Sequence, residues 1–312
     1  MSVFLLATRQ AACQRERRLW LTSRMDAYPS ARSSSIGRQY FDGRGRLVRT
    51  ARENCMSLFD LAGKVAVVTG STRGIGKAIA YRMAEHGAKV VVSSRKVDAC
   101  VAVTDEINKD FGGESPVALA IPCNISSKEE LQNLVDSTTE HWGKIDILVC
   151  NAAVNPYFGP SLECPDDAFD KIIACNVRSN HWLCNMVLPQ MKERRDGAII
   201  IVSSIGGLVG SPMLGVYGIS KAADFQLARN LAVEHGADNI RVNAIAPGLI
   251  KTDFSRALWQ NEKILEHTVS TAPLRRIGDP DEIAGAAVFL ASDAGAFTTG
   301  QKIVIDGGQT IA

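Results

Sequence analysis

The stretch KVAVVTGSTRGIGKAIAYRMAEHG, residues 64–87, decides how this chain folds. It opens with VAVV at 65–68, a short apolar run rich in β-branched residues and bounded by glycines, which is typical of a buried parallel strand. After the turn, apolar residues recur at helical spacing as far as Gly87, namely Ile75, Ile79, Ala80 and Met83. The stretch therefore predicts a strand, a glycine-rich turn and a helix in immediate succession.

The turn between strand and helix contains Gly70, Gly74 and Gly76. Glycine lets backbone approach a ligand closely, and the N-terminus of the next helix presents free N–H groups and a positive dipole end. We therefore interpret the turn as a cradle for the phosphates of a dinucleotide. The spacing is G-x-x-x-G-x-G rather than the better-known G-x-G-x-x-G, and an ordinary turn is the alternative.

Composition narrows the class of protein. The chain has 312 residues, 46% of them hydrophobic, which is enough for a substantial core. A net charge of +2 argues against a nucleic-acid partner, and the absence of an apolar run of about eighteen residues argues against a membrane span. The eight cysteines form no C-x-x-C pair, so we expect buried free thiols, a reducing compartment and no metal site.

Residues 1–55 differ from the rest of the chain. They hold eleven arginines, no lysine and four acidic residues, and they show no sustained hydrophobic period. We expect a disordered basic extension. Three interpretations are open: a transit peptide, which would place the protein in mitochondria or plastids, a functional basic tail, or a start codon assigned too early. We favour the last, because Met56 followed by SLFDLAGKVAVVTG is itself a natural beginning.

From residue 64 onward, strand and helix patterns alternate without a break. Strands are predicted at 65–69, 89–94, 117–122, 145–150, 198–203, 240–245 and 302–306, and helices at 75–86, 97–111, 127–141, 166–192, 216–235 and 280–292. This alternation indicates an α/β fold, a doubly wound parallel sheet with helices on both faces, in one domain spanning 56–312. The long link at 250–279 is interpreted as a substrate lid, with a packed surface helix as the alternative.

The end of the second strand indicates which dinucleotide is bound. In doubly wound folds an acid at this point usually holds the ribose 2′-hydroxyl of NAD. Here the strand ends Ser-Ser-Arg-Lys with no acid, and Arg95 can instead pair with a 2′-phosphate. Arg73, inside the glycine turn, can reach the same phosphate. The sequence therefore favours NADP(H) over NAD(H), although Arg95 and Lys96 would also suit a solvated strand end.

A second group of residues suggests acid–base chemistry. Tyr217 and Lys221 are four apart on a predicted helix, so the ammonium can approach the phenol. A nearby ammonium stabilises phenolate and brings the phenol pKa toward working pH. Ser204 follows a predicted strand at the ligand-binding edge of the sheet, where its hydroxyl can bond a substrate oxygen. Ser203 is the adjacent competitor for that role.

Together these motifs resemble the classical short-chain dehydrogenase/reductase family over residues 58–310. The motifs are TGSTRGIG at 69–76, Asn151-Ala152-Ala153, Ser204, Tyr217-x-x-x-Lys221 and Pro247-Gly248. The resemblance implies a seven-stranded Rossmann-type sheet and hydride transfer at a nicotinamide. It implies that Tyr217 is the acid–base, that Lys221 lowers its pKa and holds the nicotinamide ribose, and that Ser204 orients the carbonyl. Asn176 matches the asparagine that supports a proton-relay water.

The resemblance also implies a set of cofactor-binding residues. Besides Tyr217 and Lys221 these are Gly70, Arg73, Gly74, Ile75, Gly76, Arg95, Asn124, Asn151, Ala152, Pro247, Gly248, Ile250 and Thr252. Two positions depart from the family pattern. Ala153 replaces a glycine, which we expect to be tolerated. Asn124 replaces an aspartate that meets the adenine, and its amide can still bond a base edge.

Within the family, VVSSRK at 91–96, NAAVNPYF at 151–158 and APGLIKTDFSRALW at 246–259 are similar to the NADPH-dependent carbonyl reductase group called dehydrogenase/reductase member four. We therefore expect an NADP(H)-dependent enzyme that interconverts a small-molecule ketone or aldehyde and an alcohol. By resemblance we expect a homotetramer, and from the thiols a cytoplasmic protein. The alternatives are a 3-oxoacyl-thioester (acyl-carrier-protein) reductase and a catalytically idle NADP(H)-sensing regulator.

Overall fold

The computed structural model describes residues 40–41, 47–48 and 58–312. In the N-terminal unit, Met1–Thr50, strand β1 (Tyr40–Phe41) pairs antiparallel with β2 (Leu47–Val48). The remainder of the predicted basic extension, residues 1–55, lies outside the described residues, so its expected disorder stays a prediction. Among the helices that are described, none has the length and apolar character needed to cross a membrane.

The second unit is built on a seven-stranded, wholly parallel sheet in the order β5-β4-β3-β6-β7-β8-β9. Its strands are β3 (Val65–Thr69), β4 (Lys89–Ser93), β5 (Ala118–Ala120), β6 (Ile147–Cys150), β7 (Gly197–Val202), β8 (Ile240–Pro247) and β9 (Lys302–Ile305). The order reverses between β3 and β6, which is where doubly wound sheets bind their ligands. The predicted doubly wound α/β sheet is therefore confirmed.

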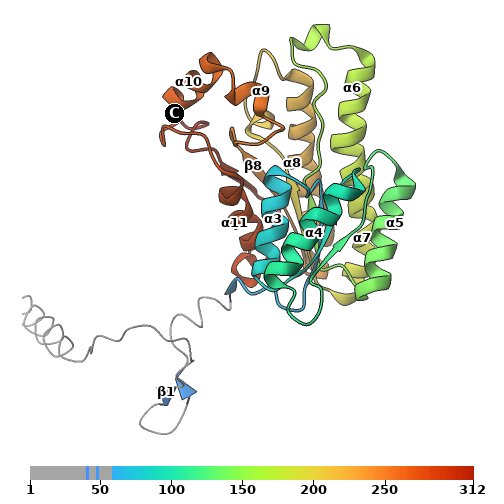
Figure 1. The fold of residues 1–312 in the computed structure, drawn as a ribbon. Coiled ribbons are helices and arrows are strands. Elements are labelled where there is room, and N and C mark those ends of the chain that lie inside the picture. Colours follow the sequence, from blue (N-terminus) through green and yellow to red (C-terminus); the bar gives the residue numbers. More distant parts are fainter. Residues whose placement is uncertain (1–39, 42–46, 49–57) are drawn as a thin grey trace, which may run out of the picture. The chain divides into compact units, whose positions relative to one another are not determined.

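Helices cover both faces of this sheet (Figure 1). One layer contains α3 (Gly74–Glu85), α4 (Val97–Phe111) and α11 (Pro280–Ala291), and the other contains α5 (Lys128–Trp142), α7 (Ser179–Arg194) and α8 (Gly215–His235). The predicted helix starts hold. Ser127 accepts a hydrogen bond from the Glu130 N–H (3.1 Å) before α5, and the Glu282 carboxylate accepts from the Asp279 N–H (2.9 Å) before α11.

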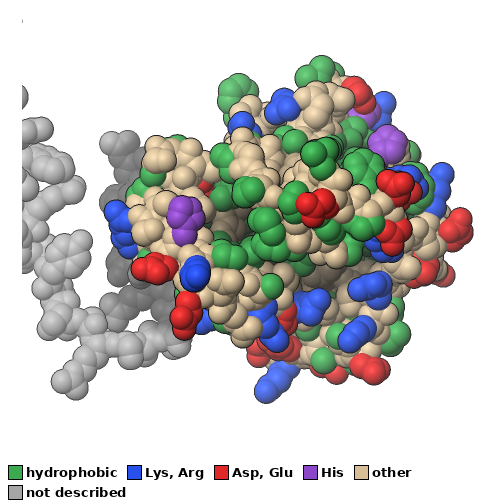
Figure 2. Space-filling model, turned by 90° about the horizontal axis from the view of Figure 1, so that it is seen from above, with side chains coloured by type: hydrophobic (Ala, Val, Ile, Leu, Met, Phe, Trp, Pro, Cys, Tyr) green, Lys and Arg blue, Asp and Glu red, His purple; other side chains and the backbone are tan. Residues whose placement is uncertain are grey.

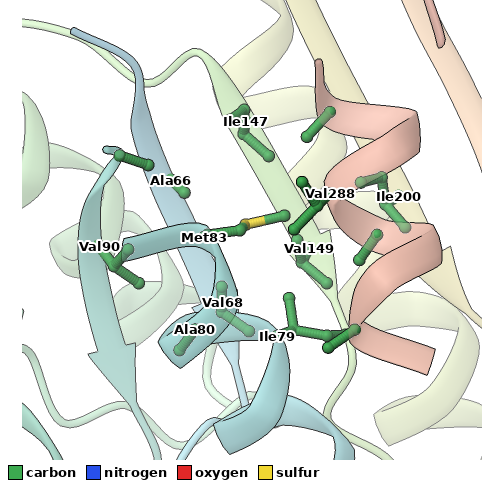
Figure 3. Close-up of a cluster of buried hydrophobic side chains, with 14 of the residues drawn as sticks. Ala66, Val68, Ile79, Ala80, Met83, Val90, Ile147, Val149, Ile200 and Val288 are labelled. Carbon is green, nitrogen blue, oxygen red and sulfur yellow. The ribbon is translucent and has the colours of Figure 1, made fainter. Parts of the chain in front are cut away.

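Alternate residues of each inner strand supply two separate cores. In β3, Ala66 and Val68 pack with the layer of α3, α4 and α11, while Val67 packs with the layer of α5, α7 and α8. Figure 3 shows the first core, where Met83 of α3 lies between the strands and Val288 of α11. Such two-sided burial explains why the strands are continuous apolar runs rather than alternating ones.

The helix predicted over 166–192 differs from expectation. It consists of α6 (Asp166–Ile173), one π-helical turn, η2 (Ala174–Arg178), and α7, which continues past Pro189 to Arg194. Similarly, the link at 250–279 carries two short helices, α9 (Arg256–Trp259) and α10 (Glu262–Thr271). π-Turns are frequent at functional sites, and this one contains Asn176, which is fully buried.

The cysteines agree with the expectation of buried thiols. Within the described part of the chain, Cys100, Cys123, Cys150, Cys175 and Cys184 are buried and unpaired, and Cys164 is half-buried.

Candidate active site

A cavity of about 840 Å³ lies at the carboxyl edge of the sheet. Its walls come from the glycine turn, the ends of β4, β6 and β7, helix α8 and the loop after β8. Figure 2 looks onto this end of the molecule and shows a hollow with hydrophobic side chains around it and several Lys and Arg side chains beside it. The cavity therefore brings together residues that are far apart in the sequence.

The glycine turn has the geometry that its sequence predicts. Gly70 and Gly74 have φ values of 66° and 55°, in the left-handed region that side chains disfavour. A Cβ at Gly76 would lie 2.4 Å from both the Gly70 carbonyl oxygen and the Asn151 side-chain nitrogen. Only glycine permits this close packing, and it brings the N-terminus of α3 to the cavity.

The first turn of α3 is open to a ligand. Arg73 is the N-cap residue, and within the described chain its side chain makes no capping hydrogen bond. The first turn also lacks an acidic side chain, so its N–H groups keep their capacity to bind an anion. This open N-terminus beside a glycine cradle fits a dinucleotide phosphate.

Asn151 fastens the glycine turn to the neighbouring strand. Its side-chain nitrogen donates to the carbonyl oxygens of Thr69 (2.9 Å) and Gly70 (3.2 Å). Thr69 completes the junction, because its hydroxyl oxygen accepts from the N–H groups of Asn151 (3.0 Å) and Ala152 (3.1 Å). We did not single out Thr69 from the sequence. Its place as the last residue of a strand before the glycine turn is the signal that would have identified it.

The two predicted phosphate-binding arginines line the same cavity. Arg95 is exposed just beyond β4, and Arg73 projects from the glycine turn. Arg73 also lies 3.9 Å from the Asp253 carboxylate, with 69% of its side chain exposed. Because both guanidinium groups are solvated and at the mouth, either can turn to an anion without breaking a buried contact. Asn124 lines this end as well and is half-buried.

The predicted acid–base group lies at the other end of the cavity, on α8. Tyr217 is half-buried at the wall, and the Lys221 ammonium lies 5.8 Å from the centre of its ring. Lys221 is only 1% exposed. Burial is the largest influence and raises the pKa of the Tyr217 phenol above its ordinary value, although the charge of Lys221 and the hydroxyl of Ser204 lower it. The net direction is therefore opposite to the shift toward working pH that the sequence led us to expect. Lys221 and Ser204 therefore both act on the Tyr217 phenol.

The two adjacent serines after β7 have different surroundings. The Ser203 hydroxyl donates to the Lys221 carbonyl oxygen (2.7 Å) and thereby anchors α8 to the sheet. The Ser204 hydroxyl accepts from the Gly206 N–H (3.0 Å) and stands beside the Tyr217 phenol. Of the two hydroxyls, that of Ser204 lies beside the Tyr217 phenol, whereas Ser203 is the serine that lines the cavity.

Asn176 connects the π-turn to the cavity wall. Its side-chain oxygen accepts from the Val154 N–H (2.9 Å), and its nitrogen donates to the Val154 carbonyl (3.0 Å) and to the Ser220 hydroxyl (3.1 Å). The amide thus fixes both the loop after β6 and helix α8. Its backbone carbonyl oxygen accepts from the Asn180 side chain at 2.7 Å.

The residues after β8 close the remaining side. Gly248 is packed so closely that a Cβ there would lie 2.8 Å from the Asp306 Cα, and Ile250 is buried. Thr252 lines the cavity and touches the glycine turn at Gly74, where an added Cβ would lie 3.2 Å from the Thr252 methyl carbon. Of the predicted cofactor-binding residues, Pro247, Gly248 and Ile250 stand behind the wall rather than on it.

One apolar residue at this site, Phe254, was not predicted from the sequence. Phe254, 52% exposed, lines the cavity with its ring 6.2 Å from the Tyr217 ring. Exposed aromatic rings beside a reacting group favour an apolar substrate body. The sequence offered only its position two residues after Thr252 as a signal.

Comparison with known proteins agrees with this geometry. A family model described as "Enoyl-(Acyl carrier protein) reductase" matches residues 70–310. The chain is 43% identical over 251 residues to "Dehydrogenase/reductase SDR family member 4" of Bos taurus, covering 80% of this chain and 88% of that protein. It is 42% identical over 250 residues, with the same shares of the two chains, to the human "Dehydrogenase/reductase SDR family member 2, mitochondrial".

Two solved structures share the fold. One is a gluconate 5-dehydrogenase from Burkholderia cenocepacia in complex with NADP and tartrate, with a TM-score of 0.78 and 29% identity over 83% of this chain and 99% of that one. The other is a 7α-hydroxysteroid dehydrogenase complexed with NADH and 7-oxo glycochenodeoxycholic acid, with a TM-score of 0.76 and 38% identity over 81% and 96%.

Proposed function

The chain belongs to the short-chain dehydrogenase/reductase family, and from this premise we propose that it interconverts a ketone or aldehyde and an alcohol with NADP(H). The observation that carries the proposal is that Tyr217 and Lys221 line one end of a cavity whose other end is a glycine cradle, with the Ser204 hydroxyl beside the Tyr217 phenol. A nicotinamide cofactor, when bound, supplies or accepts the hydride. The relatives' identity and the complexes of solved neighbours with NADP and NADH support this reaction class.

The chain's own residues would divide the remaining work. The glycine turn and the open N-terminus of α3 would hold the cofactor phosphates. Ser204 would bond the substrate oxygen and orient the carbonyl, while Tyr217 gives a proton to that oxygen in reduction and removes it in oxidation. Lys221 would stabilise the phenolate by its charge and hold the ribose, and Asn176 would fix the wall behind them.

Replacing Tyr217 with Phe tests the central assignment. The change removes the proton donor and barely alters volume, so carbonyl reduction should fall about 10²- to 10⁴-fold, the usual contribution of a positioned acid. Tyr81→Phe is the matched control, because Tyr81 lies on α3 and its hydroxyl donates only to exposed Asp110 (2.8 Å). Retention of the parent rate by the Tyr217 variant would refute the assignment.

We propose NADP(H) as the preferred cofactor because Arg95 and Arg73 line the cavity where an adenosine 2′-phosphate would lie. The residues directly after β4, at 94–96, also include no acid that could hold a ribose 2′-hydroxyl instead. Arg95→Ala should lower catalytic efficiency with NADPH about 10- to 100-fold, since bonds to charged groups contribute ~1.5–3 kcal/mol. Efficiency with NADH serves as the internal control and should stay nearly constant. Equal efficiency of the parent enzyme with both cofactors would overturn the preference.

Reduction of an acyl-carrier thioester is the second candidate, because the matching family model is that of an enoyl-(acyl carrier protein) reductase. A carrier needs basic residues near the active site. The nearest candidates from the sequence, Lys192, Arg194 and Arg195, stand at the C-terminus of α7, which leads to the amino end of β7, the edge opposite the cavity. Lys192 and Arg195 both pair with Asp238 at 3.6 Å. Turnover of a free acetoacetyl thioester faster than of simple ketones would favour this candidate.

An idle NADP(H)-sensing regulator has less support. Such a protein has no need of a complete acid–base set, and here the set is complete. Measurable turnover that disappears in the Tyr217→Phe variant would exclude it.

We also propose a homotetramer that resides in the cytoplasm, or in mitochondria if residues 1–55 act as a transit peptide. Exposed apolar side chains support self-association, notably Ile219 and Val233 on α8 (55% and 86% exposed) and Val304 on the edge strand β9. Light scattering would measure the subunit number. N-terminal sequencing and fractionation of the native protein would locate it.

A further inference from the structure

A buried carboxylate stands beside the active-site lysine. Asp224 follows Lys221 by three residues on α8, and its Oδ2 lies 3.0 Å from the Lys221 Nζ. The two side chains are 0% and 1% exposed. Taking a carboxylate out of water is costly unless its partners are well placed. The roles proposed above for Tyr217 and Lys221 do not by themselves explain why a carboxylate is buried at this position.

Two of the three ammonium N–H groups of Lys221 are committed within the described chain. One donates to the Val202 carbonyl oxygen at the end of β7 (2.9 Å), and one donates to Asp224. An ammonium has three donors in tetrahedral arrangement. Because Lys221 also lines the cavity, two fixed bonds behind it direct the third N–H into the cavity.

Asp224 is itself held from the opposite side. Its other oxygen, Oδ1, accepts from the Asn180 side chain on α7 at 3.0 Å, and the same nitrogen donates to the Asn176 carbonyl oxygen at 2.7 Å. Asn180 is also buried. Both carboxylate oxygens are thus bonded, so Asp224 cannot rotate away from Lys221 without losing a buried hydrogen bond.

We propose that Asp224 is a positioning residue for the active site: with Asn180 behind it, Asp224 fixes the Lys221 ammonium so that one N–H faces the cofactor-binding cavity. This inference rests on the proposed function of Lys221. It predicts that replacing Asp224 changes both the position of the Lys221 ammonium and the balance of charge beside the Tyr217 phenol.

The charges around the pair determine the sign of the effect. Lys221 lowers the pKa of the Tyr217 phenol, and Asp224 raises it. Besides Tyr217, the titratable group that faces Lys221 and Asp224 is the thiol of Cys150 on β6, which contacts Cys184 on α7. Contact with Cys184 and burial raise the pKa of Cys150 well above its ordinary value, so that thiol is neutral. Removing the Asp224 charge therefore leaves the Lys221 charge unopposed and lowers the phenol pKa.

The first test follows the Tyr217 phenol by ultraviolet difference titration of the cofactor-free protein, with the Tyr217→Phe variant subtracted. Asp224→Asn should lower the titration midpoint of the Tyr217 phenol by about one pH unit. That is the effect expected when one unit charge is removed from within about 10 Å of the phenol in a protein interior. Asp146→Asn is the matched control. Asp146 is equally buried (2% exposed) and paired with Lys144 at 2.9 Å, but it lies at the amino end of β6. An equal midpoint in all three proteins would overturn the proposal.

The second test is a double-mutant cycle read by urea denaturation. Asp224→Asn should lower the unfolding midpoint strongly while Lys221 is present, because an ammonium is left buried and unpaired. In a Lys221→Met background the same change should have little effect or raise the midpoint. If only the single variant fails to fold and the double variant folds, the coupling is supported. Equal effects in both backgrounds, or failure of both to fold, would overturn the proposal.

A third test measures NADPH affinity. Together the tests distinguish a failure of this inference from a failure of the proposed function. Fluorescence titration should show Asp224→Asn binding NADPH several-fold more weakly, while Asp146→Asn binds like the parent. If Tyr217→Phe keeps its activity, the proposed function fails, and the titration and the cycle still report on Asp224. If Tyr217→Phe is inactive but Asp224→Asn changes neither midpoint, this inference alone fails.

Discussion

The junction between β3 and the glycine turn depends on one hydroxyl, and replacing Thr69 with Val tests it. Thr69 is 2% exposed, and its hydroxyl oxygen accepts from the backbone N–H groups of Asn151 and Ala152. It also donates to the Val149 carbonyl oxygen at 3.3 Å. Valine keeps the shape and the β-branching but leaves these groups without their partner.

The structure sets the magnitude of this loss. A buried donor left without a partner costs ~1–3 kcal/mol, and two donors are affected. Both amides are only part-buried beside the cavity, where water can replace the hydroxyl in part. We therefore take the lower end and expect the free energy of unfolding to fall by about 2 kcal/mol. Cofactor affinity should fall with it, because the same two amides shape the cavity wall.

A matched control exists in α4. Thr104 is also buried, and its hydroxyl has no hydrogen-bond partner among the described residues. Thr104→Val is the same chemical change with no bond lost, so its stability should stay constant or rise. Urea denaturation of both variants and fluorescence titration with NADPH give the comparison. If the two variants unfold within about 0.5 kcal/mol of each other, which is the range of ordinary surface changes, the hydroxyl does not secure the junction.

Three further predictions follow from described contacts. Gly76→Ala places a Cβ 2.4 Å from a carbonyl oxygen and a side-chain amide, so overpacking should lower the free energy of unfolding by ~1–3 kcal/mol and weaken cofactor binding. Gly285→Ala on α11 is the control, because a Cβ there would meet nothing within 4 Å in the described chain. It should raise the free energy of unfolding by up to ~1 kcal/mol. Reversal of that order in denaturation curves would contradict the packing. Alcohol oxidation should accelerate as pH rises, because Tyr217 must be ionised to accept a proton, whereas reduction should slow; a flat pH–rate profile for oxidation would count against this role. The Arg276 guanidinium and the Asp279 N–H hold the pKa of the Glu282 carboxyl at about 2 instead of 4.5, so its stabilisation is present above pH 4.5 and lost as pH falls toward about 2. The stability difference between Glu282→Gln and the parent should therefore shrink over this interval in urea titrations, and a constant difference would contradict the pKa assignment.

The sheet and most helices were predictable because their signals are local. Apolar runs of five or six residues, glycine at the turns and capping residues before α5 and α11 identify the elements without knowledge of their neighbours. The π-turn was not predictable, since the sequence of 174–178 continues the helical pattern. The partners of the Asn176 side chain within it, Val154 and Ser220, lie in other parts of the chain.

The candidate site divides in the same way. Tyr217, Lys221 and the glycines stand in short spacings that the sequence displays directly. Thr69 meets its partners 82 and 83 residues later, and Asn180 meets Asp224 across 44. A carboxylate one turn after an active-site lysine is visible in the sequence, but whether it faces solvent or the lysine is decided by packing.

Successive side chains of strand β3 point to opposite faces of the sheet. Its even-numbered residues, Ala66 and Val68, belong to one core and Val67 to the other, so one inserted residue would assign every following side chain to the wrong core. Two inserted residues would return each following side chain to its own face but move the glycine turn about 7 Å along the strand. The 2.9 Å hydrogen bond from Asn151 cannot follow such a movement. The number of residues between Gly63 and Gly70 is therefore fixed as strictly as the identity of either glycine.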